Sequence, residues 1–477
     1  MKQCRTDKKT VWILPYLLIA AVSAVVLLKP FGDGDELWNY NFARCIADGM
    51  VPYRDFSIIQ TPLSAYIPAL FMTVLGRGLL VYRLAGWGLM LSMMMLTYGL
   101  CRRITGSGFL AMLAALLLFG LSLPYFVYNY NYLTVLVLLI LFFLEREGAP
   151  SVRRAALIGF LAGLLPLLKQ STGAVLLLSH ILLTAALAVW FRYPRRCVLW
   201  RMGMSILPLA VYVCYLLAVG AFDDFWEYAI LGIGTFTHRF TPLDLIIKAP
   251  VFLVFFVMIG AVYFVILRAI RKNGITQTQL SAVVMASAFA SVAYPLCDVH
   301  HLVCFLIVLT PVFMLFLKKK TYGNREMRIC GTAAAIVTAF SLVVFLPFGE
   351  GYMLSTLSNY EGIVISERGN ANIEEISSFI AKKTAEGYRV RIADDSAAAY
   401  RIPLDLYEKN WDMLLVGNLG SSTVQQLLQC EERCLYLVYR NTDELKMQNH
   451  FELIGYIREH YRKIGEVLYF DVYEAVP

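Results

Sequence analysis

Long apolar runs make up most of this chain, and they restrict it to structures that a lipid bilayer can surround. Hydrophobic residues account for 59% of the sequence and charged residues for only 16%, and the mean hydropathy of +0.63 exceeds that of soluble domains. About twenty apolar residues in a helix cross about 30 Å of hydrocarbon. The runs that we interpret as spans are residues 11–29, 84–101, 108–125, 131–144, 155–170, 173–191, 202–221, 248–267, 279–296, 301–317 and 328–347. The sequence therefore predicts a polytopic α-helical membrane protein with about eleven transmembrane helices.

One further apolar segment, Pro62 to Leu75, is too short to be assigned as a span. It carries Pro62 and Pro68 and is followed by Gly76-Arg77-Gly78. We interpret residues 62–76 as an interfacial or re-entrant helix. If this segment crossed the bilayer, every later loop would change side and the bias of basic residues would invert.

Lys and Arg concentrate in alternate loops, and this bias orients the spans. The basic loops are MKQCRTDKK, CRRITGSG, EREGAPSVRR, FRYPRRCVLWR, RAIRKNG and KKKTYGNREMR, which the positive-inside rule assigns to the cytoplasm. The predicted location is thus a cell membrane, crossed many times, with a cytoplasmic N-terminus. The first loop, residues 30–61, the long loop 222–247 and the C-terminal tail are expected on the extracytoplasmic side.

The N-terminal segment also resembles a secretory signal, with Val22-Ser23-Ala24 as a small-residue cleavage site. Its apolar stretch continues for several residues past that point. This length favours an uncleaved membrane anchor over a signal peptide.

The composition changes after Phe348. We therefore expect a membrane domain over residues 1–348 and a small extracytoplasmic α/β domain over residues 349–477. Periodicity predicts its helices and strands: helices at 373–387 and 451–465, and strands at 388–393, 434–440 and 466–474. Asp394-Asp395-Ser396 directly follows a predicted strand, where we favour a polar turn over a site.

Several function classes find no support in the sequence. The net charge of +8 is dispersed between spans, without a basic groove carrying aromatic residues, which argues against nucleic acid as a partner. No Walker loop or GxGxxG motif follows a strand. The ten cysteines form no CxxC pair, and Cys430 and Cys434 are expected to be free thiols because pairing them would close a very short loop.

The first loop begins with three carboxylates beside a predicted membrane surface: Asp33, Asp35 and Glu36. A carboxylate held where water and lipid head groups meet can take a proton from an acceptor hydroxyl. Asp33 is the alternative to Asp35 as a base and a candidate contact for an acceptor or metal, although its position between two glycines is typical of a turn. Asp35 begins a predicted helix, so capping that helix is the alternative to a catalytic role.

Cations at the outer face could neutralise a lipid phosphate as it leaves. The candidates are Arg44 and Arg54 in the first loop, Lys169 between two spans, and Arg239 in the long loop. For Lys169 the alternative is a lysine that extends its ammonium to the membrane surface.

A second polar group, Asp298 with His300 and His301, lies between two later spans. It could contact an acceptor or, because His and carboxylates are competent ligands, a metal. The alternative is an ordinary hydrophilic turn.

Together these residues resemble the first extracytoplasmic loop of the membrane-embedded GT-C glycosyltransferases, which include the protein O-mannosyltransferases and the bacterial aminoarabinose transferases. The resemblance rests on Asp35-Glu36 after the first span, then Tyr40, Ala43-Arg44, Asp48-Gly49, Pro52-Tyr53-Arg54-Asp55 and Thr61-Pro62-Leu63. It continues more loosely through Arg83-Leu84, the CRRITG turn, Lys169-Gln170, the PLCDVHH turn and the C-terminal α/β domain.

The resemblance implies an inverting enzyme that moves a sugar from a polyprenyl-phosphate carrier to a glycan, lipid or protein acceptor on the outer side of the membrane. It assigns the general base to Asp35, with Glu36 as a neighbour that orients Asp35 or helps to hold a metal. One departure is the next outer loop, LSLPYFVYNYNY, which has no carboxylate where some members carry one. A divalent metal is therefore an open question for this chain, and Asp223, Asp224 and Glu227 of the long loop are more typical of an interfacial helix than of a replacement ligand set.

Two other classes of function are alternatives. A transporter of a lipid or glycan would place ionisable residues or broken helices within the spans, which carry little charge apart from their ends. A non-catalytic membrane protein that displays its C-terminal domain would explain the tail but gives the acids of the first loop no role.

Overall fold

The computed structural model describes residues 7–32, 34–146, 150–232, 241–317, 324–347, 351–414, 419–420, 422–430, 433–440 and 451–475. The chain divides into two compact units. Unit 1 comprises residues 1–28, 86–212 and 239–346, and unit 2 comprises residues 29–85, 213–238 and 347–477. The composition suggested a boundary after residue 348, where the apolar spans stop. The units instead group the first loop with the C-terminal residues, because they follow which segments contact one another.

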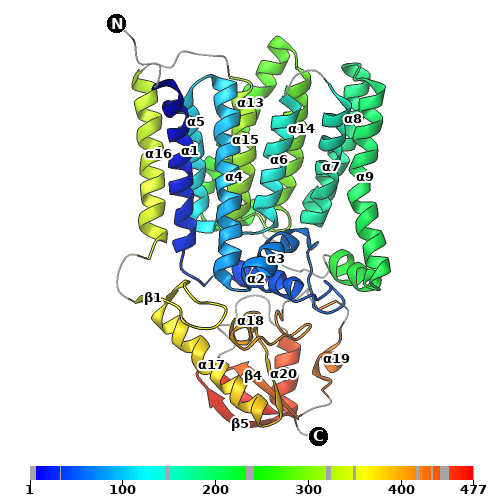
Figure 1. Cartoon of the computed structure of the whole chain (residues 1–477), viewed down its shortest axis with the longest axis vertical. Helices are drawn as coiled ribbons and strands as arrows, with labels where there is room; N and C mark the ends of the chain where they lie inside the picture. Colours follow the sequence, from blue (N-terminus) through cyan, green and yellow to red (C-terminus); the bar gives the residue numbers. More distant parts are fainter. Residues whose placement is uncertain are drawn as a thin grey trace. The chain divides into compact units, whose positions relative to one another are not determined.

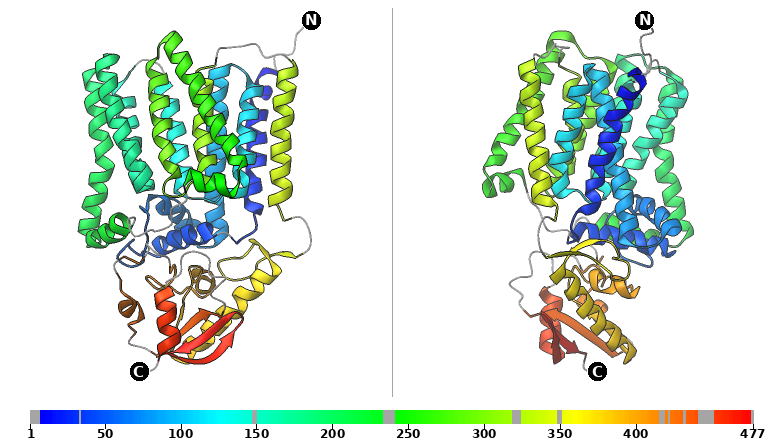
Figure 2. Two further views of the ribbon diagram at one scale, coloured as in Figure 1. Left: turned by 180° about the vertical axis from the view of Figure 1, so that it is seen from behind. Right: turned by 60° about the vertical axis from the view of Figure 1, so that its left-hand side comes forward.

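Long helices account for nearly all of unit 1 and lie side by side in Figure 1 and Figure 2. They are α1 (Asp7–Ser23, continued by η1, Ala24–Leu28), α4 (Leu79–Thr105), α5 (Gly108–Ser122), α6 (Tyr130–Arg146), α7 (Val152–Leu168), α8 (Gln170–Trp190), α9 (Arg195–Ala218), α13 (Val251–Asn273), α14 (Gln277–Phe289), α15 (Val299–Met314) and α16 (Asn324–Phe345). The first turns of α4 and the last turns of α9 belong to unit 2. Short helical pieces η2 (Leu123–Tyr125), α12 (Pro242–Lys248) and η4 (Ala290–Ala293) join them. Each span expected from the sequence overlaps one of these helices.

Among the described residues, five helices are long and apolar enough to cross a membrane: Leu79–Thr105, Gly108–Tyr125, Gln170–Trp190, Arg195–Ala218 and Val251–Asn273. Four shorter apolar helices accompany them: Ile13–Leu28, Leu63–Leu75, Val299–Met314 and Ala334–Val344. The chain is therefore a largely helical membrane protein. The count of about eleven spans stays a prediction.

Glycines allow α7 to contact α9 through its backbone. A Cβ added to Gly159 would collide with the backbone of Arg201, and one added to Gly163 would collide with Ser205 and Pro208. Small residues at helix contacts are typical of membrane bundles, where they let two backbones approach closely.

Unit 2 places two helices directly after the first span, α2 (Gly34–Ala47) and α3 (Leu63–Leu75), and these pack against each other. One face of α3 buries Ala65, Ala69 and Met72, whereas Leu70 and Val74 on the opposite face are 68% and 77% exposed. An apolar exposed face on a short helix is typical of a helix lying in the membrane interface. The long loop contributes α10 (Phe222–Phe225) and the π-helix η3 (Trp226–Leu231).

The C-terminal residues of unit 2 form an α/β domain, as expected. Its elements are β1 (Tyr352–Leu354), β2 (Val364–Ser366), α17 (Glu367–Ala385), β3 (Tyr388–Ile392), α18 (Ala398–Arg401), η5 (Ile402–Leu404), α19 (Val424–Leu428), β4 (Arg433–Tyr439), α20 (Phe451–His460), β5 (Arg462–Val467) and β6 (Phe470–Glu474). β1 and β2 pair antiparallel, and the larger sheet has the order β3-β4-β6-β5, with β3 and β4 parallel. Trp411, Leu414 and Tyr436 are part of its core.

Three expectations for this domain are corrected. The helix predicted over 451–465 ends at His460, because residues 462–467 instead form β5. The strand predicted over 466–474 is interrupted by a tight turn in which Leu468 takes a positive φ of 47°, so β5 and β6 form a hairpin. Cys430 and Cys434 are disulfide-bonded rather than free, since their Cα atoms lie 6.7 Å apart, within the range that a disulfide spans.

Candidate active site

The candidate base Asp35 is the second residue of α2 and is exposed. Because α2 begins at Gly34, Asp35 lies within the first turn rather than at the preceding cap position. The positive end of the helix dipole favours an ionised carboxylate there. Asp33 lies outside the described residues.

Glu36, the next residue, has a different environment. Both of its carboxylate oxygens accept from the Arg83 guanidinium, each at 2.8 Å, and both side chains are buried. Arg83 also donates to the carbonyl of Lys29. This bidentate pair joins the start of α2 to the start of α4, so the Glu36 carboxylate is occupied in holding the helix.

The arginines expected to contact phosphate are engaged with carboxylates. Arg44 is fully buried and donates to Asp405 at 3.2 Å and to the carbonyls of Ile402 and Leu406. Arg54 is largely exposed and forms a two-point pair with Asp55 at 2.8 and 2.9 Å. In each case a neighbouring carboxylate offsets the positive charge. Arg239 lies outside the described residues.

Lys169 has neutral partners in unit 1. It is the single extended residue between α7 and α8, and its side chain is buried rather than reaching toward solvent. Its Nζ donates to the Asn131 amide oxygen at 3.1 Å and to the Val292 carbonyl at 3.4 Å, and lies 5.4 Å from the centre of the Tyr130 ring. These contacts orient the ammonium without cancelling its charge.

Asp298, His300 and His301 join the same group. Asp298 caps α15 and accepts from the backbone N–H of His301 and, at 2.8 Å, from its Nδ1. The Nδ1 of His300 lies 3.2 Å from the carbonyl of Tyr125. Since carbonyl and carboxylate oxygens only accept, both rings carry their proton on Nδ1 in this arrangement.

The two Nε2 atoms are then left as acceptors, and both face the Asn131 amide nitrogen, at 3.3 and 3.4 Å. We name Lys169, Asn131, Asp298, His300 and His301 the lysine-histidine group. It connects the N-terminal ends of α6 and α15 with the junction of α7 and α8.

A metal is not supported by ligand geometry here. Within the described ranges, no three His, Cys, Asp or Glu side chains come together as a metal site would require. His300 and His301 do approach each other, but Asn131 occupies the position between their Nε2 atoms.

Sequence reasoning missed Asn129 and Asn131. The sequence showed them only as part of a loop lacking carboxylates, yet Asn131 links Lys169 to both histidines, and Asn129 lies 3.5 Å from His300 Nε2. Two asparagines in a loop without charged residues were the available signal.

A second buried polar group was also missed. Arg201 on α9 pairs with Glu145 on α6 at 2.5 Å and donates to His180 on α8 at 3.3 Å, and Arg201 and His180 are both 1% exposed. Arg201 was assigned to a cytoplasmic loop, but α9 begins at Arg195, so it lies one to two turns inside the helix.

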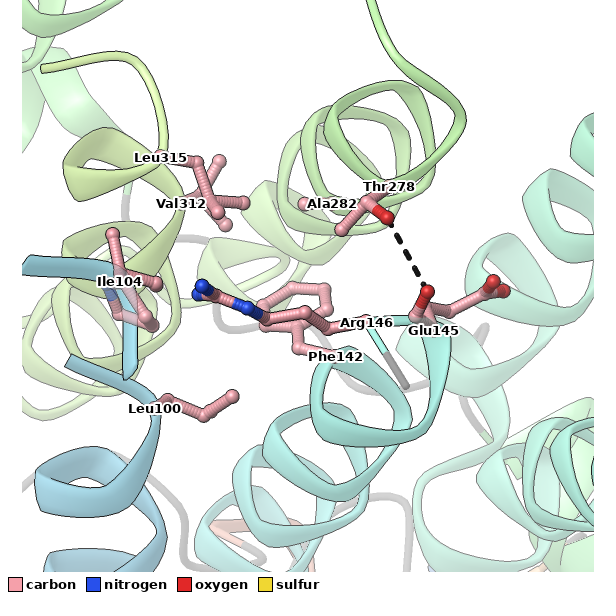
Figure 3. Close-up of a pocket in the computed structure, with 10 residues that line it drawn as sticks. Leu100, Ile104, Phe142, Glu145, Arg146, Thr278, Ala282, Val312 and Leu315 are labelled. Carbon is pink, nitrogen blue, oxygen red and sulfur yellow. Dashed lines mark hydrogen bonds between the residues drawn. The ribbon is translucent and has the colours of Figure 1, made fainter. Parts of the chain in front are cut away.

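A small pocket lies at the opposite ends of α6 and α15 from the lysine-histidine group. Its lining includes Leu100, Phe142, Arg146, Val312 and Leu315. Figure 3 shows the Arg146 side chain extending across it, whereas the Glu145 carboxylate points away. Apolar side chains line most of this space, and the Arg146 side chain occupies part of it.

The Asp394-Asp395-Ser396 segment follows β3 as a turn, as favoured from the sequence. Asp394 is buried and accepts from the Ser396 backbone N–H and hydroxyl. Burial, together with the charge of Asp394, raises the pKa of Asp395 to about 7. The backbone carbonyl of Asp395 accepts at 2.9 Å from the indole of Trp38 on α2.

Comparison with known proteins identifies the fold. No protein-family model matches the sequence, and no curated protein matches it. Among solved structures, ArnT from Cupriavidus metallidurans in the apo state is similar over 99% of this chain and 100% of its own, with a TM-score of 0.61 and 13% identity. The same protein bound to undecaprenyl phosphate is similar over 98% of this chain and 99% of its own, with a TM-score of 0.57 and 13% identity.

The chain therefore has the fold of the GT-C membrane glycosyltransferases along nearly its whole length. The similarity to ArnT, an aminoarabinose transferase, extends over nearly all of both chains.

Proposed function

We propose that this chain is an inverting membrane glycosyltransferase that uses a polyprenyl-phosphate-linked sugar as donor. The acceptor is a hydroxyl-bearing glycan, lipid or protein on the extracytoplasmic side. The observation that carries the proposal is the full-length similarity to ArnT, one structure of which contains undecaprenyl phosphate. A shared fold does not by itself determine a reaction, which depends on the site residues of this chain.

Asp35 is the general base in this proposal. Its carboxylate takes the proton of the acceptor hydroxyl while the hydroxyl oxygen bonds to the anomeric carbon of the sugar. The bond from that carbon to the phosphate oxygen breaks, and the polyprenyl phosphate leaves with the electron pair. Attack from the face opposite the phosphate inverts the anomeric configuration.

The contrast between Asp35 and Glu36 supports this assignment. Glu36 is buried and paired through both oxygens with Arg83, so it anchors the helix, whereas Asp35 is exposed at the start of that helix. A base must be reachable by its substrate, and Asp35 meets this requirement better than Glu36.

The lysine-histidine group is the proposed phosphate site. Negative charge grows on the phosphate as the sugar departs, and a fixed cation stabilises that charge more than it stabilises the ground state. The hydrogen bonds of Lys169 to Asn131 and Val292 hold its ammonium in place inside the protein. Arg44 and Arg54 are less suited because Asp405 and Asp55 already pair with them.

The test is sugar transfer by the full-length protein in lipid vesicles. Undecaprenyl-phosphate-linked sugars, including a hexose and aminoarabinose, would be supplied with a cell-envelope extract, and released undecaprenyl phosphate and labelled product would be measured. The proposal expects transfer by the wild type and its loss in Asp35→Asn. Asp223→Asn, a change of the same kind in the long loop, should leave transfer intact.

The same experiment separates the alternatives. Movement of an intact lipid-linked sugar between leaflets without cleavage would indicate a transporter. No cleavage and no movement with any donor would favour a display role. Unchanged transfer in Asp35→Asn would remove Asp35 as the base.

A further inference from the structure

Residues 405–412 of the C-terminal domain contact the first loop at several points, and we name this segment the clasp. Asp405 pairs with Arg44 on α2, and the clasp residue Asp412 accepts from Asn41 of the same helix at 3.4 Å. The Tyr407 hydroxyl donates to Asp48 just after α2. Beyond it, the Asn410 backbone N–H donates to Ser57 at 3.2 Å.

The clasp also contacts the long loop within the same unit. Lys409 Nζ donates to the carbonyl of Arg54 in the first loop at 3.1 Å and lies 3.7 Å from the Asp224 carboxylate. It lies 5.3 Å from the ring centre of Tyr228, whose hydroxyl donates to Asn410 at 3.1 Å. One lysine thus bonds to both outer loops, which are separated by more than 160 residues along the chain.

The clasp is itself held firmly by its own domain. Glu408 accepts from Arg391 at 2.7 Å and from Arg401 at 3.1 Å, and Arg401 also pairs with Asp412 at 3.4 Å. Trp411 is 2% exposed in the domain core. A segment fixed at its base by buried ion pairs can transmit a constraint to whatever it touches at its surface.

We infer that the clasp is a positioning element, which fixes α2 and the helix 222–231 relative to each other through Tyr407 and Lys409. The C-terminal domain then sets the orientation of the helix that carries Asp35, instead of being an appendage. The kinetic part of this inference rests on the proposed function, whereas the structural coupling does not.

Hydrogen–deuterium exchange of the full-length protein tests the coupling directly. Lys409→Met keeps the aliphatic stem and removes the ammonium that contacts both loops. We expect amide exchange to rise about fivefold to tenfold in residues 50–57 and 222–231 together, the size expected for loss of one ordinary hydrogen bond.

Lys383→Met is the matched control. Lys383 likewise pairs with a carboxylate, Glu386, and lies near an aromatic ring, Tyr388, but it is on α17. It should leave exchange in both loops unchanged. Equal exchange profiles for Lys409→Met and Lys383→Met would overturn the inference.

A second variant distinguishes a local loss of protection in α2 from general unfolding. Tyr407→Phe removes only the hydroxyl that donates to Asp48, and should raise exchange in α2 while α17 stays protected. Tyr388→Phe removes a hydroxyl that donates to Glu474 at 3.1 Å within the domain, and should not affect α2. If α2 and α17 lost protection together in Tyr407→Phe, or if neither changed, the positioning role would be wrong.

Kinetics with the donor that the wild type accepts provide the last readout. Lys409→Met should lower kcat about fivefold with the donor KM unchanged, because it misplaces the base without altering the lysine-histidine group. A rise in KM alone would contradict positioning. If the wild type transferred no sugar, the proposed function would fail while the exchange experiment still decided the coupling.

Discussion

The lysine-histidine group of unit 1 and the acidic start of α2 in unit 2 hold their charged side chains in different environments. Lys169 is buried, yet the hydrogen bonds that orient it come from neutral oxygens of Asn131 and Val292. On α2, the buried carboxylate Glu36 is paired completely with Arg83, and the neighbouring Asp35 is exposed. The first region orients a buried ammonium through neutral oxygens, whereas the second pairs its buried carboxylate with an arginine and exposes the neighbouring one.

This difference separates charges used for architecture from charges available for chemistry. A buried ion pair costs nearly as much in desolvation as it returns, but breaking it leaves an unpaired buried charge and is strongly destabilising. Glu36 with Arg83, and Arg201 with Glu145, fit that description. Asp35 is exposed and Lys169 hydrogen-bonds to neutral oxygens, and we expect their replacement to affect activity more than folding.

The largest expected effect is that of Asp35→Asn. Removing a general base should lower kcat by about 10²- to 10⁴-fold, with the thermal midpoint in detergent nearly unchanged because the side chain is exposed. Transfer assays paired with thermal unfolding would measure both. A large loss of stability would assign Asp35 to architecture and break the comparison.

Glu36→Gln should show the reverse pattern. It leaves the buried Arg83 guanidinium without its carboxylate, and we expect a loss of about 3–5 kcal/mol in the free energy of unfolding. Denaturant titration of the purified protein is the measurement, with the exposed Glu361→Gln as control. A stable Glu36→Gln protein that had lost only activity would contradict the architectural role.

Lys169→Met should weaken binding of undecaprenyl phosphate by about 10- to 100-fold, the cost of removing a charged hydrogen-bond donor. Binding would be measured in detergent by displacement of a fluorescent analogue. Lys248→Met on α12, an exposed lysine of the same unit, provides the control. Equal affinities for the two variants would show that the buried ammonium does not contact the phosphate.

The smallest expected effect is the pH dependence of stability that comes from the Asp395 carboxyl group. The native pKa of Asp395 is about 7 and its ordinary value is 3.8, so between these values the folded state binds more protons than the unfolded state. Stability should therefore fall as pH rises, by about 2 kcal/mol between pH 5.5 and 7 if one proton is involved. The remainder of this contribution is lost between pH 7 and about 8.

Asp395→Asn, which stays uncharged, should flatten that slope, whereas the exposed Glu374→Gln on α17 should not. Unfolding free energies at pH 5.5, 7 and 8 would measure it. A slope that persisted in Asp395→Asn would assign the pH dependence to another group.

The helices were largely predictable because apolar runs and Pro or Gly interruptions are local features of the sequence. The apolar runs over 173–191 and 62–76 correspond to the helices α8 and α3. In the C-terminal domain, alternation at 388–393 and 434–440 identified β3 and β4. It did not separate β5 from β6, since a two-residue turn at Leu468 and Tyr469 leaves no Gly or Pro signal.

The site was predictable only as single residues. Lys169, His300 and His301 could be selected because charged or imidazole groups are rare near apolar spans. Their meeting at Asn131 could not, because it depends on how α6, α7, α8 and α15 pack. The pairing of Glu36 with Arg83 and the contacts of the clasp likewise join residues that are distant in sequence, and no local pattern records them.

The close approach of α7 to α9 has a consequence for the gene. Every missense change in a glycine codon adds at least one carbon to the side chain, and at Gly159 and Gly163 that first carbon already meets the backbone of the facing helix. No conservative exchange exists at these two codons. Variation in natural populations should therefore be scarce there and abundant on lipid-facing positions such as Val211, which is 60% exposed.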